Sequence, residues 1–491
     1  MFQDAPSPDA GSEISRADRC YLAQDWAGAL ALYESAERAD PTLSARLSLP
    51  LMICHCRIEL AEDAALVAPA PPAAATGSAR EQYVVEILRA RAHEMCRAGA
   101  FARSSQLLRS LIEYDAAIAD AYRNGLAPGR SDRSRAATDE RDPPFLQALG
   151  IAALPVDALQ RTHRGQRLLL VYRRFFSEAG PRRGEVINCL ATSAERFGLA
   201  VKPFRFLGPD PAGLAPALLQ EILDYEPHLI VFDDQYPRSM SSEPELLRDQ
   251  IEAIFSMARQ QLGIRVVNSY MDAWQPLQRG PDMLFRGLGS AFDLIQHGHP
   301  AALGAGGSDQ NARSYCYMLP AWVPAPSVAP GTVPRACFAG SITWFNISRL
   351  AWWAETARRG LPIDFYETLH YEGTPRSDQD YADLLAQHQV ALSFTRRSNG
   401  PTITTGRTLD IPLVGGVLVE ENSADTAFFL QPGLHYVPFE SIDDLAALLP
   451  ALLADPARRE CIRSAGQRWV QTYFTGDYFW AGLLRRLNDL A

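Results

Sequence analysis

The segment from residue 390 to residue 422 most constrains how this chain folds, because it places an anion-binding pattern between two apolar runs. It reads VALSFTRRSNGPTITTGRTLDIPLVGGVLVEEN. Residues 391–394 predict a buried strand, and the run after Gly-Gly predicts a second, parallel strand. The residues between them supply cations, hydroxyl groups and a helix start near residue 406, whose free N–H groups favour an anion. Since ligands of open parallel sheets lie at the carboxyl ends of strands, the segment predicts a diphosphate site.

The candidate diphosphate contacts come from this loop and helix start. Arg407 lies on the first helical turn, where a guanidinium can bind a phosphate through two parallel hydrogen bonds. Asp410 lies one turn into the helix, where its carboxylate can accept hydrogen bonds from ribose hydroxyls. The alternative interpretations are a solvated arginine loop and, for Asp410, a charge that interacts only with the helix dipole. The full candidate set is Arg396, Arg397, Thr404, Thr405, Gly406, Arg407 and Asp410.

Three stretches follow one another from Tyr381 to Phe474: YADLLAQHQVALSFT, GRTLDIPLVGGVLVEEN, and a final stretch with a Pro-Gly turn, a Val-Pro-Phe strand and an amphipathic helix pair. Their order resembles that of the spore-maturation CgeB (YkvP-like) glycosyltransferases. The resemblance implies a GT-B architecture with a nucleotide-sugar donor in the C-terminal half. The family's usual Glu after Gly-Arg is Asp410 here. In related two-domain transferases a glycine turn lies beside the donor phosphates, which adds Gly340 and Ser341 to the candidate donor contacts.

Strand and helix patterns alternate from residue 166 onward, which predicts parallel sheets with right-handed crossovers. Expected strands are 167–172, 200–206, 228–232, 264–269, 292–296 and 315–318 in a first sheet, and 336–339, 363–366, 391–394 and 417–420 in a second. The expected fold class is α/β, with two Rossmann-like doubly wound parallel sheets (GT-B) preceded by an all-α TPR-like domain. We divide the chain into a flexible N-terminus (1–14), a TPR-like helical domain (15–125), a linker (126–162), a Rossmann-like acceptor-side domain (163–330), a Rossmann-like nucleotide-sugar-binding domain (331–475) and a C-terminal helix (476–491) that crosses back to the acceptor-side domain.

The first organised block of the chain is helical and repeat-like. Residues 21–36, closed by Asp40 and Pro41, resemble a tetratricopeptide unit, and residues 92–114 resemble a second, weaker copy. A solenoid normally needs three or more repeats to be stable alone. Two interpretations therefore stay open: a surface for a protein partner or acceptor, and a helical cap that only supports the catalytic half.

Charge and apolar patterning exclude several classes of protein. The net charge is −10, and almost all basic residues are arginine, which argues against a nucleic-acid binder that depends on phosphate neutralisation. No run approaches eighteen apolar residues, and the start MFQDAPSPDAGSE lacks the basic and apolar regions of a signal peptide, so we expect a cytoplasmic protein. The tight group Cys54, His55 and Cys56 offers only two metal ligands, so we expect no metal site.

Acidic and histidine side chains follow several expected strands of the first sheet. Asp272 follows one strand, and His297 and His299 follow another in the stretch IQHGHP. A histidine at such a carboxyl end can act as the general base for an acceptor hydroxyl, because its pKa lies close to working pH. The alternatives are a histidine that bonds a backbone carbonyl and a two-ligand metal fragment. The candidate catalytic residues are His297, His299 and Asp272.

Two functions from different classes agree with these residues. The first is a metal-independent glycosyltransferase that needs no cofactor and moves a sugar from a nucleotide-diphosphate sugar to an unidentified acceptor hydroxyl or protein side chain between the two sheets. The second is a catalytically impaired, transferase-like binding module that recruits a protein partner through its helical N-terminus. A third, a tetratricopeptide-containing protein glycosyltransferase similar to the O-GlcNAc transferases, needs a longer superhelix than two repeats provide.

Overall fold

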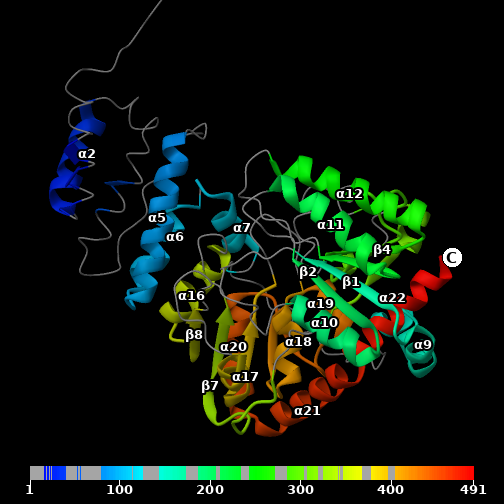
Figure 1. Cartoon of the computed structure of the whole chain (residues 1–491). Helices are drawn as coiled ribbons and strands as arrows, with labels where there is room; N and C mark the ends of the chain where they lie inside the picture. The colour runs from blue at the N-terminus through cyan, green and yellow to red at the C-terminus, as the bar shows by residue number, and fades with distance from the viewer. Residues whose placement is uncertain are drawn as a thin grey trace, which may run out of the picture.

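The computed structural model describes N-terminal helices followed by two α/β domains (Figure 1). The described residues are 16–17, 19–20, 23, 25–39, 52–53, 56, 79–112, 114–124, 126, 143–172, 186–205, 211–233, 243–270, 285–303, 307–318, 324–340, 342, 347–367, 378–395 and 404–490. The predicted N-terminus 1–14 and part of the predicted linker lie outside them. Among the described helices, none combines the length and apolar character required to cross a membrane.

The first α/β domain is a six-stranded parallel sheet with strand order β2-β1-β3-β4-β5-β6. Its elements are β1 (Arg167–Tyr172), α10 (Val186–Phe197), β2 (Ala200–Arg205), α11 (Pro211–Tyr225), β3 (Leu229–Asp233), α12 (Glu243–Leu262), β4 (Arg265–Tyr270), β5 (Leu294–His297), η2 (Pro300–Ala302), α15 (Ser308–Ala312) and β6 (Ser314–Cys316). The Leu-Leu-Leu-Val centre of β1 is fully buried, as expected for a parallel strand covered on both faces. Strand order reverses between β1 and β3, where Tyr172 pairs with Asp233. The carboxyl edge beside this pair is therefore the ligand-binding position of such a sheet.

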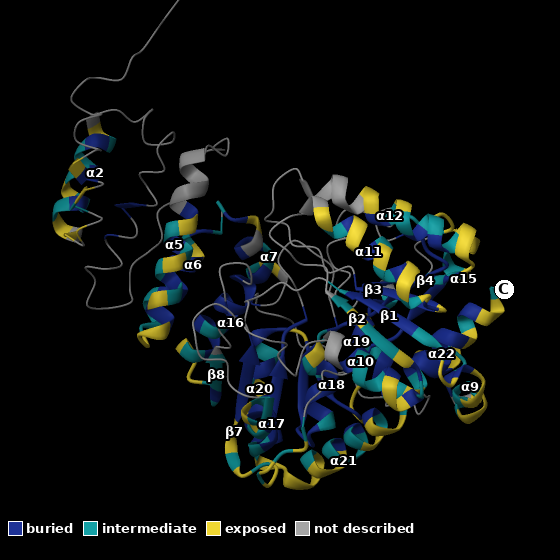
Figure 2. Ribbon diagram, in the orientation of Figure 1, coloured by how far each residue is buried: buried dark blue, intermediate teal, exposed yellow. Residues whose placement is uncertain are grey.

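The second domain is a five-stranded sheet with strand order β11-β10-β9-β7-β8 and parallel pairing throughout. Its elements are β7 (Val333–Gly340), α16 (Ile347–Arg358), β8 (Ile363–Glu367), α17 (Asp378–Gln387), β9 (His388–Ser393), α18 (Gly406–Leu413), β10 (Leu418–Glu421), α19 (Ala424–Phe429), β11 (Val437–Phe439), α20 (Ile442–Ala454) and α21 (Pro456–Tyr473). Here the order reverses between β7 and β9, so Gly340 and Ser393 end the two strands that border the switch point. Two doubly wound parallel sheets confirm the predicted fold class, and Figure 2 shows their strands buried beneath helices with exposed outer faces.

The last helix, α22 (Gly476–Asp489), leaves the second domain and packs against α10 of the first. Trp480 is fully buried, and its indole N–H donates to the Ser193 hydroxyl at 2.9 Å. The Tyr315 hydroxyl donates to the Phe479 carbonyl at 3.2 Å. A side chain at Gly482 would place a Cβ only 2.3 Å from that hydroxyl, so this close approach requires glycine. Aromatic packing and hydrogen bonds thus join α22 to the first sheet.

The predicted linker (126–162) contains short helices in its described part. They are α8 (Pro144–Ala148), η1 (Ile151–Ala153) and α9 (Val156–His163), and the last residue of α9 belongs to the predicted acceptor-side domain. The fully buried Phe145 ring stacks on Phe474 with centroids 4.8 Å apart and also contacts Tyr317 and Phe429. The polar composition that precedes residue 143 favours a linker, whereas the Phe145 ring packs against aromatic residues of both domains.

Three of the described N-terminal helices contact α16 of the second domain. Those described are α2 (Trp26–Ala39), α5 (Ala79–Arg97), α6 (Phe101–Ser110) and α7 (Ala116–Asn124). α6 and α7 contact α16, and their apolar core is continuous with that of the second sheet. The Trp353 ring of α16 lies between Phe101 at 6.3 Å and Phe365 at 5.6 Å, measured between centroids. The tetratricopeptide resemblance itself stays a prediction.

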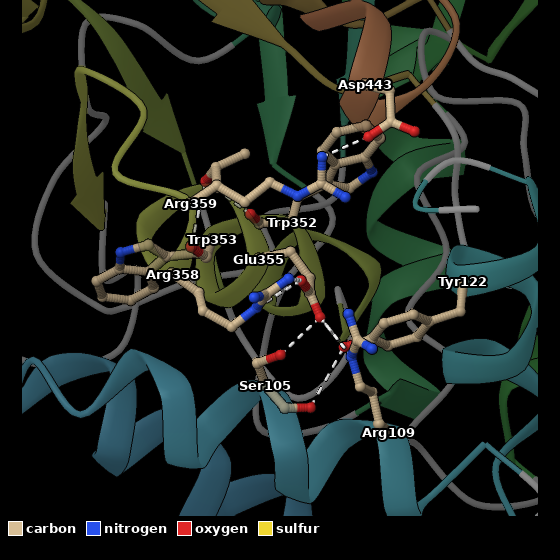
Figure 3. A network of polar contacts seen from close by, with 10 residues as sticks. Ser105, Arg109, Tyr122, Trp352, Trp353, Glu355, Arg358, Arg359 and Asp443 are labelled. Atoms are coloured by element: carbon tan, nitrogen blue, oxygen red, sulfur yellow. Dashed lines mark hydrogen bonds and ion pairs between the residues drawn. The ribbon is translucent and has the colours of Figure 1, made fainter. Parts of the chain in front are cut away.

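A buried carboxylate, Glu355, stands at the centre of this contact (Figure 3). It accepts hydrogen bonds from Ser105 at 2.6 Å, Arg109 at 2.8 Å and Tyr122 at 3.1 Å, all from the N-terminal helices. Arg358 of α16 donates twice to the other carboxylate oxygen, at 3.0 and 2.9 Å. Burial alone would raise the pKa of Glu355, but the donors from Arg109, Ser105 and Arg358 outweigh it and lower the pKa to about 2. An ionised, hydrogen-bonded carboxylate therefore holds α6 and α7 to α16.

Candidate functional site

The helix that follows β9 begins with reciprocal capping bonds. Thr405 is the N-cap of α18, and its backbone N–H donates to the Thr408 hydroxyl at 3.3 Å. The Thr408 backbone N–H donates to the Thr405 carbonyl at 3.0 Å. Gly406, the first helical residue, has room for a Cβ at ordinary contact distance from Asp410. The capped start leaves the remaining amides of the first turn aimed out of the helix end, where an anion is favoured.

Arg407 lies across the end of β7. Its guanidinium carbon is 5.0 Å from the centroid of the Phe338 ring, and one terminal nitrogen donates to the Ala339 carbonyl at 3.4 Å. A Cβ on Gly340 would lie 2.6 Å from that nitrogen, so the approach of the guanidinium to the strand depends on glycine. The structure thus brings Gly340 and Arg407 together at the switch point between β7 and β9.

Asp410 is buried beside Tyr381 of α17. The Tyr381 hydroxyl donates to an Asp410 carboxylate oxygen at 3.5 Å, and Asp410 is 3% exposed. The pKa of Tyr381 is raised, first by burial and then by the negative charge of Asp410, while Arg407 opposes the shift. Asp410 thus belongs to the same cluster as Arg407, and its contact with a ribose stays a prediction.

Glu420, at the end of β10, is a buried carboxylate of this cluster that sequence reasoning missed. Its oxygens accept hydrogen bonds from the Thr408 hydroxyl at 2.7 Å and from the Thr426 hydroxyl. Burial raises the pKa of Glu420 to about 7, against the opposing effects of its hydroxyl donors and the Arg407 charge. The sequence does carry a signal for this residue: two glutamates follow the apolar run Val-Leu-Val. A charged side chain at the carboxyl end of a parallel strand lies where such sheets bind ligands.

Thr404, immediately before the N-cap, adds a buried hydroxyl. It is 3% exposed, and its Oγ1 has no hydrogen-bond partner among the residues that the structure describes. Leaving a buried hydroxyl unpaired costs about 1 to 3 kcal/mol. A polar ligand at the start of α18 would satisfy it.

The histidine pair of the first domain is buried at the carboxyl end of β5. His297 is 0% and His299 1% exposed. The His297 Nδ1 accepts from the His299 backbone N–H at 3.3 Å, so its Nε2 carries the proton and donates to the Ser314 hydroxyl at 2.6 Å. Both ring nitrogens of His297 are therefore engaged in hydrogen bonds within the first domain, and a catalytic role for either histidine stays a prediction.

Burial and the neighbouring His299 lower the pKa of His297 from 6.5 to about 3. The unfolded chain therefore binds one more proton than the folded protein between those values. Stability that is full above pH 6.5 should fall as the pH drops, by up to about 1.4 kcal/mol per pH unit from this group. We expect nuclear magnetic resonance to show a neutral His297 ring from pH 8 to pH 5. A ring that titrates between pH 6 and 7 would contradict this geometry.

Four predicted site residues lie outside the described part of the chain: Arg396, Arg397, Ser341 and Asp272. Of the remainder, the structure gathers Gly340, Thr404, Thr405, Gly406, Arg407 and Asp410 around one end of the second sheet. His297 and His299 belong to the first sheet. The described candidate residues therefore fall into two groups, one on each sheet.

Comparison with known families concerns the second domain. Residues 335–485 match the model of a family described as Glycosyl transferase-like. Over these residues the chain is similar to that family. The match covers less than half of the chain, and the narrower resemblance to CgeB proteins stays a prediction. No curated protein matches the chain.

Several solved structures are distantly similar. Anabaena Alr3699/HepE, crystallised with UDP and glucose, is 12% identical, with a TM-score of 0.44 over 66% of this chain and 99% of its own. Sucrose-phosphate synthase (tll1590) from Thermosynechococcus elongatus is 12% identical, with a TM-score of 0.46 over 66% of this chain and 100% of its own. The O-GlcNAc transferase of Thermobaculum terrenum, as a variant, is 14% identical, with a TM-score of 0.30 over 99% and 97%. Likenesses at this level establish no shared activity.

Proposed function

We propose that the protein is a nucleotide-sugar-dependent glycosyltransferase whose second domain binds the donor and whose first domain binds the acceptor. The observation that carries the proposal is the meeting of Arg407 with Gly340 at the β7–β9 switch point, beside the capped start of α18. A guanidinium, helix amides and a buried hydroxyl at one edge form a set of donors suited to a diphosphate. The glycosyltransferase family match includes this whole cluster.

Catalysis on the donor side would be electrostatic. When the bond between sugar and diphosphate breaks, negative charge grows on the leaving diphosphate, and donors already aimed at that position stabilise the transition state. Arg407 and the first-turn amides supply this stabilisation, with Arg396, Arg397 and Ser341 as further proposed contacts. Asp410 would hold the ribose.

On the acceptor side, the proposed base is His299, supported by His297, with Asp272 as the other candidate. A base there would remove the proton from the acceptor hydroxyl as that oxygen attacks the sugar. His299 follows β5, and its backbone N–H is fixed by the His297 ring, so the two histidines form one unit.

The alternative proposal, a binding module that recruits a partner through its N-terminal helices, has less support. It is suggested by Asp410, which stands where the CgeB-like sequences usually have Glu. The faces of α6 and α7 that contact α16 are already occupied within the chain. That contact favours a supporting role for the N-terminal helices.

We expect Arg407→Ala to weaken nucleoside diphosphate binding by about 1.5 to 3 kcal/mol, because it removes a charge-assisted hydrogen bond. Isothermal titration calorimetry with a panel of nucleoside diphosphates measures the change. Arg286→Ala is the matched control, since Arg286 pairs with Asp249 in the first domain, away from this cluster. Equal affinity in Arg407→Ala and the wild type would remove Arg407 from the site.

We also expect turnover to continue after chelation of divalent cations. The arginines and helix amides can themselves neutralise the departing diphosphate, so the proposed mechanism uses no metal ion. The measurement is release of nucleoside diphosphate from nucleotide sugars with and without EDTA. Loss of activity that manganese or magnesium restores would rule out this mechanism.

A further inference from the structure

A short hydrogen-bond relay links β10 to the start of α18. The Thr408 hydroxyl accepts from the Thr405 backbone N–H at 3.3 Å and donates to a Glu420 carboxylate oxygen at 2.7 Å. An ionised carboxylate can only accept, and a hydroxyl has one proton to donate. The ionised form of Glu420 therefore sets the direction of both hydrogen bonds. Its carboxylate accepts from the Thr408 hydroxyl, and the Thr408 oxygen accepts from the Thr405 backbone N–H.

The relay is buried and has further polar contacts with α19 and β9. Glu420 and Thr408 are both fully buried. The other Glu420 oxygen accepts from the Thr426 hydroxyl of α19, and the Thr405 hydroxyl lies 3.3 Å from that of Ser393, the last residue of β9. The N-cap of α18 is thus tied at once to β9 and, through Thr408 and Glu420, to β10.

We propose that Glu420 and Thr408 are positioning residues for the donor: their relay fixes the first turn of α18 so that its amides and Arg407 meet the diphosphate. Neither residue touches the ligand in this account. The inference rests on the proposed function, since it assigns a task within the same donor site. A helix start that is fixed before binding loses less conformational freedom when the ligand arrives.

The protonation of Glu420 is coupled to folding. Burial raises its pKa from 4.5 to about 7, so the folded protein holds the proton more tightly than the unfolded chain. A raised carboxyl pKa means that this group favours the folded state at low pH and that the contribution is lost as the pH rises from 4.5 to 7. Above pH 7 the ionised form therefore weakens the fold, and perturbed carboxyl pKa values of this kind are common at functional sites.

The test is a matched pair of substitutions at residue 408. Thr408→Val removes the hydroxyl at nearly constant shape and should weaken nucleoside diphosphate binding about tenfold, the effect of one hydrogen bond. Thr408→Ser keeps the hydroxyl and should stay within about twofold of the wild type. Thr475→Val is the control, because Thr475 caps α22 through its own hydroxyl and has no contact with the relay. Affinities come from calorimetry with the full chain, and melting temperatures verify folding.

Glu420→Met, which removes both carboxylate oxygens at similar side-chain length, gives a second, independent measurement if Thr408→Val folds poorly. It should weaken binding by a similar factor, and the double variant Thr408→Val/Glu420→Met should bind no more weakly than the poorer single variant, because both substitutions break the same relay. Additive losses, equal losses in Thr408→Val and Thr408→Ser, or wild-type affinity in folded Thr408→Val and Glu420→Met would each overturn the positioning role. A wild-type protein that binds no nucleoside diphosphate would overturn the proposed function itself.

Discussion

Glu355→Ala is expected to lower the free energy of unfolding of the unit formed by the N-terminal helices and the second domain by about 3 kcal/mol. The substitution removes a buried acceptor shared by Ser105, Arg109, Tyr122 and Arg358. The two arginines are partly exposed and can regain water, which limits the loss, whereas the buried hydroxyl of Ser105 cannot. Calorimetric or urea-induced unfolding of the full chain measures the effect.

Glu94→Ala is the matched control for Glu355→Ala. Glu94 is an exposed glutamate of α5 that pairs with Arg91 of the same helix, so its loss should change stability by less than about 0.5 kcal/mol. The folded pKa of Glu355, about 2, lies below its ordinary 4.5, so its stabilisation is full above pH 4.5 and disappears as the pH falls toward 2. If Glu355→Ala were as stable as Glu94→Ala at pH 7, the network would not hold the helices in place.

His299→Ala is expected to lower turnover by roughly a hundredfold or more while donor affinity stays near that of the wild type. A general base acts on the acceptor proton in the transition state and makes no contact with the bound nucleotide. Release of nucleoside diphosphate at saturating substrates measures turnover, and calorimetry measures donor affinity. His297→Ala is the comparison, because His297 is hydrogen bonded through both ring nitrogens and should mainly lower stability.

Two results would contradict this role of His299. Unchanged turnover in both histidine variants would make the pair structural and leave Asp272 as the next candidate for the base. An equal fall in donor affinity would move the pair to the donor side and remove the division of labour between the two sheets. A melting temperature close to that of the wild type is required before either result is interpreted.

Local patterns were enough to predict the two sheets. The apolar run of β1 was expected at 167–172 and lies at Arg167–Tyr172, and the Gly-Gly turn before β10 separates helix from strand as expected. Such signals depend on neighbours in the chain, because strands and helices bury residues with a fixed period. The start of α18 at Gly406 follows from the same kind of signal, a run of threonines and a glycine before an apolar helix.

Other features depend on residues far apart in the chain and could not be read from local patterns. Glu355 bonds Ser105 across 250 positions, and Trp480 bonds Ser193 across 287. Phe145 folds a stretch of linker-like composition because its partners come from three other segments. In the sequence, Glu420 has the pattern of an ordinary strand end. Only the structure shows that its carboxylate accepts hydrogen bonds from Thr408 and Thr426.

A structure of the protein with a bound nucleoside diphosphate tests the central claim most directly. Crystals soaked with a panel of nucleoside diphosphates should show the diphosphate at the start of α18, within hydrogen-bond distance of the Arg407 guanidinium and the first-turn amides, beside Gly340. The Thr404 hydroxyl should gain a partner in the same complex. A nucleotide bound elsewhere with this position empty, or no nucleotide bound at millimolar concentration, would contradict the account.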